Sequence, residues 1–413
     1  MVIVSHPNGN QNVRALLSAL IAQGLLTQFI TSFAWNEGSI LGPFLPSAVK
    51  TTLEKRAFQG VPLSRISQDP FGEALRVAIL RLPRRLRIGL LGEYASVPNF
   101  LVRHDASAAE RIGRVEGAEA VWCFTGSCLK TIKAAKAKGM KVYLELPSAY
   151  WRFYSELFAE EAMKCPEWAA TIDEQEESRL FSRIDEEISL ADHLVVPSSF
   201  PLMTLKKYSL PECPVSIINY GGPPALKSRE WTREPTDRIR ALYVGGLTQQ
   251  KGIGYLFEAA ARSRSVASLT VVGGIRGMEC EALNRALGEH RWIPSLPHAD
   301  VLSIMREHDV LIHPSLSEGS ALVIGEALSQ GLVPIVTPNC GVEHLVKDGI
   351  NGYVVPIRNA EIIANKLSYL NGAKDMLSVM GANALISARE NSWAAYQLKI
   401  AKLLKKTLND VEK

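Results

Sequence analysis

The chain has 413 residues, of which 47% are apolar, and it carries a formal net charge of +4. This length suits two domains of about 200 residues, and the nearly balanced charge argues against a nucleic-acid-binding protein. The six cysteines show no C-x2-C spacing, which argues against a zinc site or a disulfide framework and favours a reducing compartment. No apolar run is long enough for a signal peptide or a membrane span, so we expect a cytoplasmic protein.

Short apolar runs separated by helical patterns fill the first half of the chain. Runs with the character of buried parallel strands lie at residues 1–5, 120–124, 141–146, 192–196 and 215–219. The first of them ends in a turn cluster that contains His6, Gly9 and Asn10. This cluster lacks the G-x-G-x-x-G pattern, so a dinucleotide fingerprint is not supported.

Arginines alternate with apolar residues between Arg76 and Arg87, and Pro83 interrupts any single helix there. The pattern suits docking on an anionic membrane surface, at the inner face of the membrane, or on an acidic or phosphorylated acceptor. The more common interpretation is a solvated helix whose arginine stems cover apolar surface. Both interpretations stay open.

In the second half, strand and helix patterns alternate five or six times, which predicts a doubly wound parallel sheet. An apolar run at residues 241–244 leads through a glycine pair to Lys251 and then to a helix. The ammonium of Lys251 is suited to neutralise a diphosphate leaving group, and the alternative is a simple exposed lysine. The next strand ends in a glycine pair at residues 273–274, where a base or ribose can approach the backbone closely.

Two further strands flank a loop and a helix that carry Glu318 and Glu326. Ligands of open parallel sheets bind outside the carboxyl ends of the strands, so this loop falls where a small-molecule site is expected. Its Gly-Ser-Ala segment at a helix N-terminus suits a phosphate, with one glutamate on either side. The alternative for Glu326 is a solvated side chain on a helix face shared with Ser329 and Gln330.

These residues resemble a known signature. Glu318-Gly319, a second glutamate at position 326, and the Ala-Leu-Ser-x-Gly-x-x-Pro-x-Val that follows are similar to the motif of the large retaining glycosyltransferase family 4, or group 1. The resemblance is strong from Ala241 to Trp393 and weaker before Ala191. It implies the α/β fold called GT-B, in which two doubly wound Rossmann-like domains face a central cleft.

The resemblance also implies a function: transfer of a sugar from a nucleotide-diphosphate donor to a glycan or lipid-linked acceptor, with retention of anomeric configuration, in polysaccharide or glycolipid assembly. No metal ion or cofactor is expected. Lys251 and the N–H groups of Ser320 to Leu322 would bind the diphosphate, Glu326 the ribose and Glu318 the sugar, so Glu318 and Lys251 are the expected catalytic residues. The expected donor-binding residues are Gly245, Gly246, Lys251, Gly273, Gly274, Pro294, Glu318, Gly319, Ser320, Ala321, Leu322 and Glu326.

On the acceptor side, the resemblance implicates the first loop, with Gly9, Asn10 and His6. A turn histidine satisfied by backbone groups is the alternative for His6. Gly246 stands where the family usually has an arginine that contacts the pyrophosphate. The family's usual histidine near the reacting centre is absent too, because residues 147–148 are Pro-Ser and Glu145 is the nearest ionisable group. The catalytic role of that histidine is therefore unassigned.

Three other functions stay open. A sugar-nucleotide epimerase shares the fold class, and a non-catalytic nucleotide-sugar binding protein would fit the two missing residues. A nicotinamide oxidoreductase would need a glycine fingerprint that the chain lacks.

We expect residues 1–222 to form the acceptor-binding domain and residues 223–390 the nucleotide-sugar-binding domain. Residues 391–413 are expected to form a helix that packs back on the first domain. The alternative is a free amphipathic tail on a membrane, with a basic face made by Lys402, Lys405 and Lys406.

Overall fold

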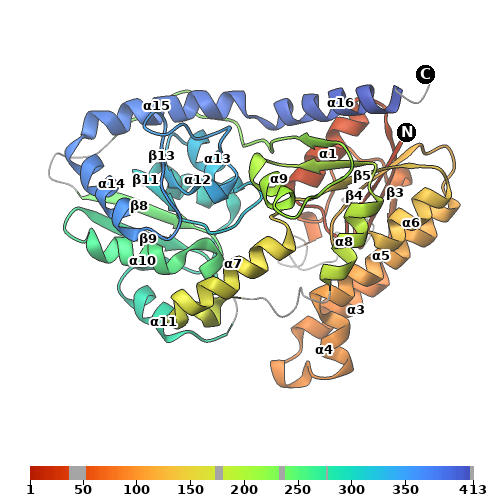
Figure 1. The fold of residues 1–413 in the computed structure, drawn as a ribbon, viewed down its shortest axis with the longest axis horizontal. Helices are drawn as coiled ribbons and strands as arrows, with labels where there is room; N and C mark the ends of the chain where they lie inside the picture. The colour runs from red at the N-terminus through yellow and green to blue at the C-terminus, as the bar shows by residue number, and fades with distance from the viewer. Residues whose placement is uncertain (37–52, 173–179, 232–237, 276–277, 410–413) are drawn as a thin grey trace.

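The computed structural model describes residues 1–36, 53–172, 180–231, 238–275 and 278–409. They form two parallel sheets with helices packed around them (Figure 1). The first sheet has the strand order β3-β2-β1-β4-β5-β6-β7. Its strands are β1 Val2–Ser5, β2 Leu26–Thr31, β3 Ile66–Gln68, β4 Ala120–Phe124, β5 Lys141–Glu145, β6 His193–Val196 and β7 Val215–Ile217.

The second sheet has the order β10-β9-β8-β11-β12-β13. Its strands are β8 Ile239–Val244, β9 Ala267–Val272, β10 Arg291–Ile293, β11 Val310–His313, β12 Val333–Val336 and β13 Tyr353–Val354. In each sheet the strand order reverses beside the first strand, β1 or β8, as in a doubly wound fold. The predicted fold class is confirmed.

Alternate residues of the strands face two separate cores, because successive side chains of a strand point to opposite faces. In β1, Val4 lies in one apolar cluster and Ile3 in another. In β8, Tyr243 and its neighbour Leu242 likewise lie in two different apolar clusters. Each sheet is therefore buried on both faces, which explains why its strands are nearly continuous apolar runs.

Helices connect the strands and cover the sheets. The helices up to β7 are α1 Gln11–Ala22, α3 Pro70–Arg81, α4 Leu90–Ala95, α5 Val97–Arg114, α6 Leu129–Ala137, α7 Trp151–Lys164, α8 Phe181–Leu190 and α9 Ser199–Lys206. Those that follow are α10 Ile253–Arg262, α11 Glu281–Gly288, α12 His298–Arg306, α13 Leu322–Ser329, α14 Ala360–Gly372, α15 Lys374–Glu390 and α16 Trp393–Asn409. Short 3-10 turns are η2 Leu63–Arg65, η3 Arg84–Leu86, η4 Pro166–Thr171, η6 Gln249–Lys251 and η7 Pro338–Cys340.

The last helix, α16, returns to the first sheet and lies along α1 (Figure 1). Tyr396, Ile400 and Leu404 are buried in the same apolar cluster as Val4 and Leu16. The predicted crossing of the C-terminal helix is confirmed, and the alternative of a free membrane-bound tail is wrong because the apolar face of the helix is already covered.

Helix α7 belongs to the first half of the sequence but packs against the second sheet, beside α10 and α11 (Figure 1). Leu157, Phe158 and Trp168, from α7 and the turn η4, lie in the core cluster that contains Tyr243. The buried carboxylate of Glu161 fixes this contact. The domain boundaries drawn from the sequence stay a prediction, and the structure adds that residues 157–168 cross to the second core.

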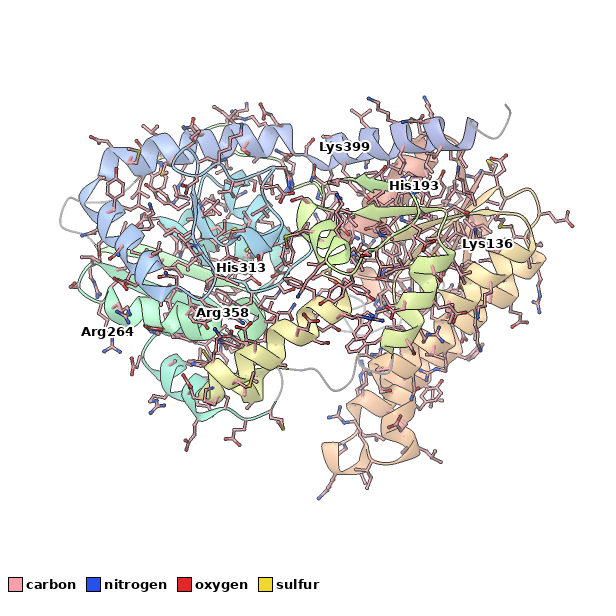
Figure 2. The ribbon with its side chains drawn as sticks, in the orientation of Figure 1. Lys136, His193, Arg264, His313, Arg358 and Lys399 are labelled. Carbon is pink, nitrogen blue, oxygen red and sulfur yellow. The ribbon has the colours of Figure 1, made fainter. Side chains whose placement is uncertain are left out.

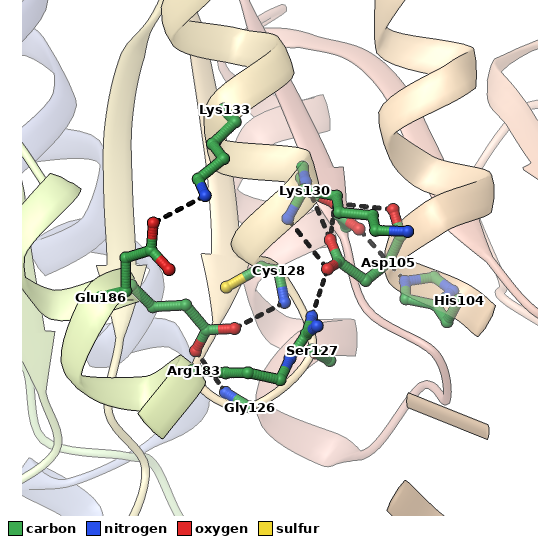
Figure 3. A network of polar contacts seen from close by, with 12 residues as sticks. His104, Asp105, Gly126, Ser127, Cys128, Lys130, Lys133, Arg183 and Glu186 are labelled. Carbon is green, nitrogen blue, oxygen red and sulfur yellow. Dashed lines mark hydrogen bonds and ion pairs between the residues drawn. The ribbon is translucent and has the colours of Figure 1, made fainter. Parts of the chain in front are cut away.

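A buried polar network holds the start of α6, at the carboxyl end of β4 (Figure 3). Asp105 accepts hydrogen bonds from the backbone N–H groups of Lys130 (2.9 Å) and Thr131 (2.8 Å) and forms an ion pair with Arg183. Glu187 accepts from the N–H of Cys128 at 3.0 Å and from Gly126. Two carboxylates thus satisfy N–H groups that the first turn of a helix leaves without partners.

Burial raises the pKa of Glu187 from its ordinary value of 4.5 to about 7, although the two N–H donors oppose the shift. A raised carboxyl pKa means that the folded chain binds more protons than the unfolded chain between these values. We therefore expect the contribution of Glu187 to the free energy of unfolding to fall by about 3 kcal/mol as the pH rises from 4.5 to above 7. Buried histidines such as His6, whose pKa is lowered to about 3, change the total in the opposite direction, so the quantity to measure is the difference between wild type and Glu187→Gln. In denaturant titrations across that range, wild type should lose about 3 kcal/mol relative to the variant, and a difference that does not change with pH would contradict the assignment.

Candidate active site

A cavity of about 660 Å³ lies in the second domain at the carboxyl ends of β8 and β11, in the size range of small-molecule sites. A cavity of similar size, about 640 Å³, lies at the opposite edge of the same sheet, beside Arg238 and Arg291. We take the first cavity as the candidate site, because open parallel sheets bind ligands at the carboxyl ends of their strands. The predicted residues Lys251, Glu318 and Glu326 also line this cavity. The cavity there is lined by Val244, Gly245, Gly246, Thr248, Gln250, Lys251, Leu296, His298, Val301, His313, Glu318, Ser320, Ala321, Leu322, Val323 and Glu326.

The centre of the cavity is an ion pair between Lys251 and Glu318. Lys251 ends the turn η6, and Gly252 follows in the left-handed region at φ 70°. A Cβ at this glycine would overlap the carbonyl of Pro314, so only glycine allows the two loops to approach. The backbone N–H of Leu316 donates to the Gln250 carbonyl at 2.9 Å, which joins the loops again.

Glu318 accepts hydrogen bonds at one oxygen, Oε1, from the Lys251 ammonium and from His313 Nε2 at 3.1 Å. Burial by itself would raise the pKa of Glu318, but the Lys251 charge and the His313 contact outweigh it and lower the pKa to about 2. Glu318 is therefore an anion at any physiological pH. It can accept hydrogen bonds and balance a positive charge, but it is not a proton donor.

His313 was not among the predicted site residues. It ends β11, its ring stacks on Tyr243 with 5.9 Å between centroids, and its side chain is 2% exposed (Figure 2). Its Nδ1 is buried without a hydrogen-bond partner among the described residues, so Nε2 is the ring nitrogen that contacts Glu318. The one signal in the sequence that could have pointed to it is its position at the carboxyl end of a strand.

We expect His313→Leu to lower the turnover of any reaction at this cavity about tenfold, because Glu318 loses one of its three side-chain donors, Lys251, His313 and Ser315. His313→Asn should retain more activity than His313→Leu, since its amide keeps an N–H donor. Steady-state kinetics on both variants, with His290→Leu outside the cavity as a control, test the role. Equal activities for the two His313 variants would show that the ring serves packing alone.

Glu326 lies on α13 and faces His298, with 2.9 Å between Oε1 and Nε2. Its side chain is only 14% exposed, and Ser329 and Gln330 are both buried. The alternative of a solvated helix face is therefore wrong. His298 begins α12 and was also absent from the predicted set; its imidazole lines the same cavity as Gly246.

The predicted N–H donors at residues 320–322 need one correction. The N–H of Ala321 donates to the Cys340 carbonyl at 3.0 Å, so it is used within the protein. Helix α13 begins at Leu322, and the first N–H groups of a helix have no partner inside it. The groups suited to an anion at this end of the cavity are therefore those of Ser320, Leu322 and Val323, and all three residues line it.

Two glycines of the predicted donor set, Gly273 and Gly319, allow close backbone packing. A Cβ at Gly273 would overlap the Gly245 carbonyl, and one at Gly319 would overlap the Pro147 carbonyl, so these loops touch through their backbones. Gly273, Gly274, Pro294 and Gly319 are not among the described residues that line the cavity. Gly319 instead joins the two domains, because its carbonyl accepts from Ser198 Oγ at 2.6 Å.

The predicted acceptor-side residues follow β1, in the other domain. Asn10 caps α1 by accepting from the Val13 N–H at 3.1 Å, and a Cβ at Gly9 would overlap Phe58. His6 accepts at Nδ1 from the Asn8 N–H at 3.0 Å, as the turn-histidine alternative expects. Burial, with the nearby His104, lowers the pKa of His6 to about 3, so it is neutral.

The structure also shows what lies where the family's histidine is missing. Glu145 is buried and accepts hydrogen bonds from Trp122 Nε1 (2.9 Å), the Tyr220 hydroxyl (2.6 Å) and Asn12 Nδ2 (3.3 Å). It is a structural residue of the first core and does not reach the cleft. Ser148, which is exposed, lies against the Gly319 loop and offers only a hydroxyl.

The described residues also show whether a metal site or a membrane span is present. They contain no cluster of three or more His, Cys, Asp or Glu side chains placed to hold a metal ion. None of their helices combines the length and the apolar character needed to cross a bilayer.

The part of the chain that forms this cavity is similar to known proteins. Residues 226–386, which include Lys251, Glu318 and Glu326, match the family model of the glycosyl transferases group 1. The chain is 25% identical over 198 residues to the amylovoran biosynthesis glycosyltransferase AmsK of Erwinia amylovora, which covers 44% of this chain and 47% of AmsK. It is 32% identical over 119 residues to the lipopolysaccharide glucosyltransferase WaaG of Escherichia coli, covering 28% and 32% of the two chains. The matched stretches thus span less than half of these relatives.

The fold is similar over nearly the whole chain. Sucrose-phosphate synthase from Thermosynechococcus elongatus superposes with a TM-score of 0.67 at 18% identity, over 99% of both chains. Anabaena HepE in complex with UDP-glucose superposes with a TM-score of 0.62 at 13% identity, over 98% of this chain and 99% of HepE. The chain therefore has the GT-B fold, and its residues 226–386, less than half of its length, match the family model of the glycosyl transferases group 1.

Proposed function

We propose that this protein is a glycosyltransferase that moves a sugar from a nucleotide-diphosphate donor to a glycan or lipid-linked acceptor with retention of anomeric configuration. The observation that carries the proposal is the Lys251–Glu318 pair beside the N-terminus of α13, inside one cavity of suitable volume. The family match supports a role in polysaccharide or glycolipid assembly, and so do the relatives that are named for amylovoran and lipopolysaccharide synthesis.

In the proposed complex, the diphosphate lies between Lys251 and the N–H groups that open α13. A fixed ammonium and a helix N-terminus stabilise the negative charge that grows on the leaving diphosphate, and this requires no metal ion. Gly246 stands where the family has its arginine, so a second donor to the nucleotide must come from another side chain. His298 and Thr248 both line the cavity and can supply one. The ribose diol is then assigned to Glu326, on the same wall as His298.

Glu318 is assigned to the sugar hydroxyls. Its Oε1 is occupied by Lys251 and His313, so an approaching hydroxyl would bind the other oxygen or replace the lysine. The reacting sugar passes through a loose, oxocarbenium-like transition state, so no protein nucleophile is required. The locked position of Glu145 agrees with this, because that carboxylate is not available to attack.

The test is turnover with a panel of nucleotide sugars and with glycan and lipid-linked acceptors, reading the anomeric configuration of the product by NMR. A transferred sugar with the donor's configuration supports the proposal, and inverted product contradicts retention. Conversion of the donor without any acceptor would indicate an epimerase. Donor binding without turnover would indicate a binding protein, a function favoured by the absence of the family's arginine and histidine.

A further inference from the structure

The helical projection made by residues 70–97 combines exposed apolar side chains with arginines. It consists of α3, the turn η3 and α4, and α4 lies at its tip, away from both sheets (Figure 1). Leu90 is 90% exposed, Phe71 86% and Ile88 73%. The other large apolar side chains exposed on this projection are Leu75, Leu80, Leu82, Leu86, Leu91 and Val97. Such a concentration is unusual for a surface that faces only water.

The inner side of the projection is firmly attached, so the exposed side is not a sign of a loose segment. Ile79 and Ala95 are buried. Arg103 donates to the Tyr94 carbonyl at 2.7 Å and stacks over the Tyr94 ring at 3.7 Å. Glu73 is buried and pairs with Arg76 at 3.5 Å. The inner face of residues 70–97 is therefore packed against the rest of the first domain. The outer, apolar face has no partner among the described residues.

The charge of the projection indicates what covers that face. Residues 81–91 contain Arg81, Arg84, Arg85 and Arg87 and no acidic residue, a formal charge of +4 that equals the net charge of the whole chain. Two copies of such a surface repel each other, which disfavours a dimer through it. Apolar side chains flanked by arginines match the boundary between the acyl chains and the phosphates of a bilayer.

A groove between α3 and α4 adds a second observation. It is lined by Arg76, Leu80, Arg87, Gly92, Ala95, Ser96 and Val97. The Nε atoms of Arg76 and Arg87 are both buried and have no hydrogen-bond partner among the described residues. Buried guanidinium donors without an acceptor suit a phosphate group. Arg76 is therefore part of this groove and not of the outer surface.

We propose that the α3–α4 projection docks on an anionic lipid bilayer, with Leu90 and Ile88 entering the interface and the arginines binding lipid phosphates. The proposal is independent of the donor site, since no cavity residue of the second domain takes part. It places the first domain against the membrane without any spanning helix. Attraction to anionic headgroups weakens with salt, whereas the apolar contribution does not.

Co-sedimentation of the full chain with vesicles tests the proposal, comparing pure phosphatidylcholine with phosphatidylcholine that contains phosphatidylglycerol. Wild type should bind the anionic vesicles and bind the neutral ones at least tenfold more weakly. Arg81→Gln with Arg85→Gln should weaken binding on the order of twentyfold, from two lost cations. Ile88→Ser with Leu90→Ser should weaken it by a similar factor; both residues are highly exposed, so folding is not at risk.

The matched control is Leu398→Ser with Lys402→Gln on α16, an exposed leucine and an exposed lysine far from the projection. It should bind vesicles like wild type. Failure of wild type to sediment with anionic vesicles, or unchanged binding by both projection variants, overturns the proposal. So does a wild-type dimer in solution that the Ile88→Ser, Leu90→Ser variant converts to a monomer, because a second copy would then cover the face.

Discussion

Replacing Lys251 by alanine should reduce sugar transfer by about a hundredfold to a thousandfold, equivalent to about 3–4 kcal/mol. Lys251 is the one Lys or Arg among the described residues that line the proposed donor cavity. Without it, the diphosphate would leave beside the Glu318 anion with no fixed positive charge to compensate. The measurement is kcat and KM for transfer, and the loss should fall mainly on kcat because the leaving-group charge is largest in the transition state.

Two further variants separate chemistry from folding. Lys251→Ala also leaves the buried Glu318 without its cation, so the variant should be less stable. Adding Glu318→Gln should restore much of that stability without restoring transfer. Lys347→Ala, an exposed lysine of the same domain, is the matched control and should keep full activity. Transfer by Lys251→Ala within about twofold of wild type would remove Lys251 from the mechanism.

The second large effect is expected at Arg358, which holds the α7 crossing. The Glu161 carboxylate, fully buried, accepts from Arg358 Nε at 2.6 Å, from Gln249 Nε2 at 2.7 Å and from the Tyr255 hydroxyl at 2.8 Å (Arg358 is labelled in Figure 2). Arg358→Ala removes the cation and leaves the charge buried. Breaking a buried pair in this way costs about 3–5 kcal/mol of unfolding free energy.

The same variant should also affect the site, because Gln249 lies in the turn that ends at Lys251. We expect Arg358→Ala to raise KM for the donor in addition to lowering the midpoint of denaturant unfolding. Arg262→Ala is the control: its pair with Glu258 on α10 is about half exposed, so the loss should stay within about 0.5 kcal/mol. A similar small loss for Arg358→Ala would mean that packing of Leu157 and Phe158, not the ion pair, fixes α7.

The central strands of both sheets could be predicted from the sequence because they are buried on both faces and form apolar runs. Strands β2 and β3 were not predicted: Thr27 and Gln28 interrupt the apolar run of β2, and all three residues of β3 are only partly buried. The path of α7 could not be predicted either. Its apolar residues predict a helix with a buried side, but nothing in the pattern of Leu157 and Phe158 says that the partner sheet comes from the other half of the chain. That choice depends on Glu161 meeting Gln249 and Arg358, contacts about ninety and two hundred residues away in sequence.

Only part of the candidate site could be predicted, because some of its residues are brought together by the fold and not by a local motif. Lys251, Glu318 and Glu326 follow a local motif, and the structure brings all three to one cavity. His313 and His298 were missed because a histidine at a strand end or a helix start has no motif of its own. Ala321 was assigned a free N–H, but the loop after β12 supplies an acceptor, Cys340, that only the folded chain brings near.

The most direct test of the donor site is calorimetric titration of nucleoside diphosphates into wild type and Glu326→Ala, with Glu307→Ala, an exposed glutamate on the same domain, as the control. We expect at least one nucleoside diphosphate to bind wild type and the Glu307 variant equally. Loss of the ribose contact in Glu326→Ala should cost about 2 kcal/mol, roughly thirtyfold in affinity. Equal affinity for wild type and Glu326→Ala, or no binding by any nucleoside diphosphate, would contradict the placement of the donor in this cavity.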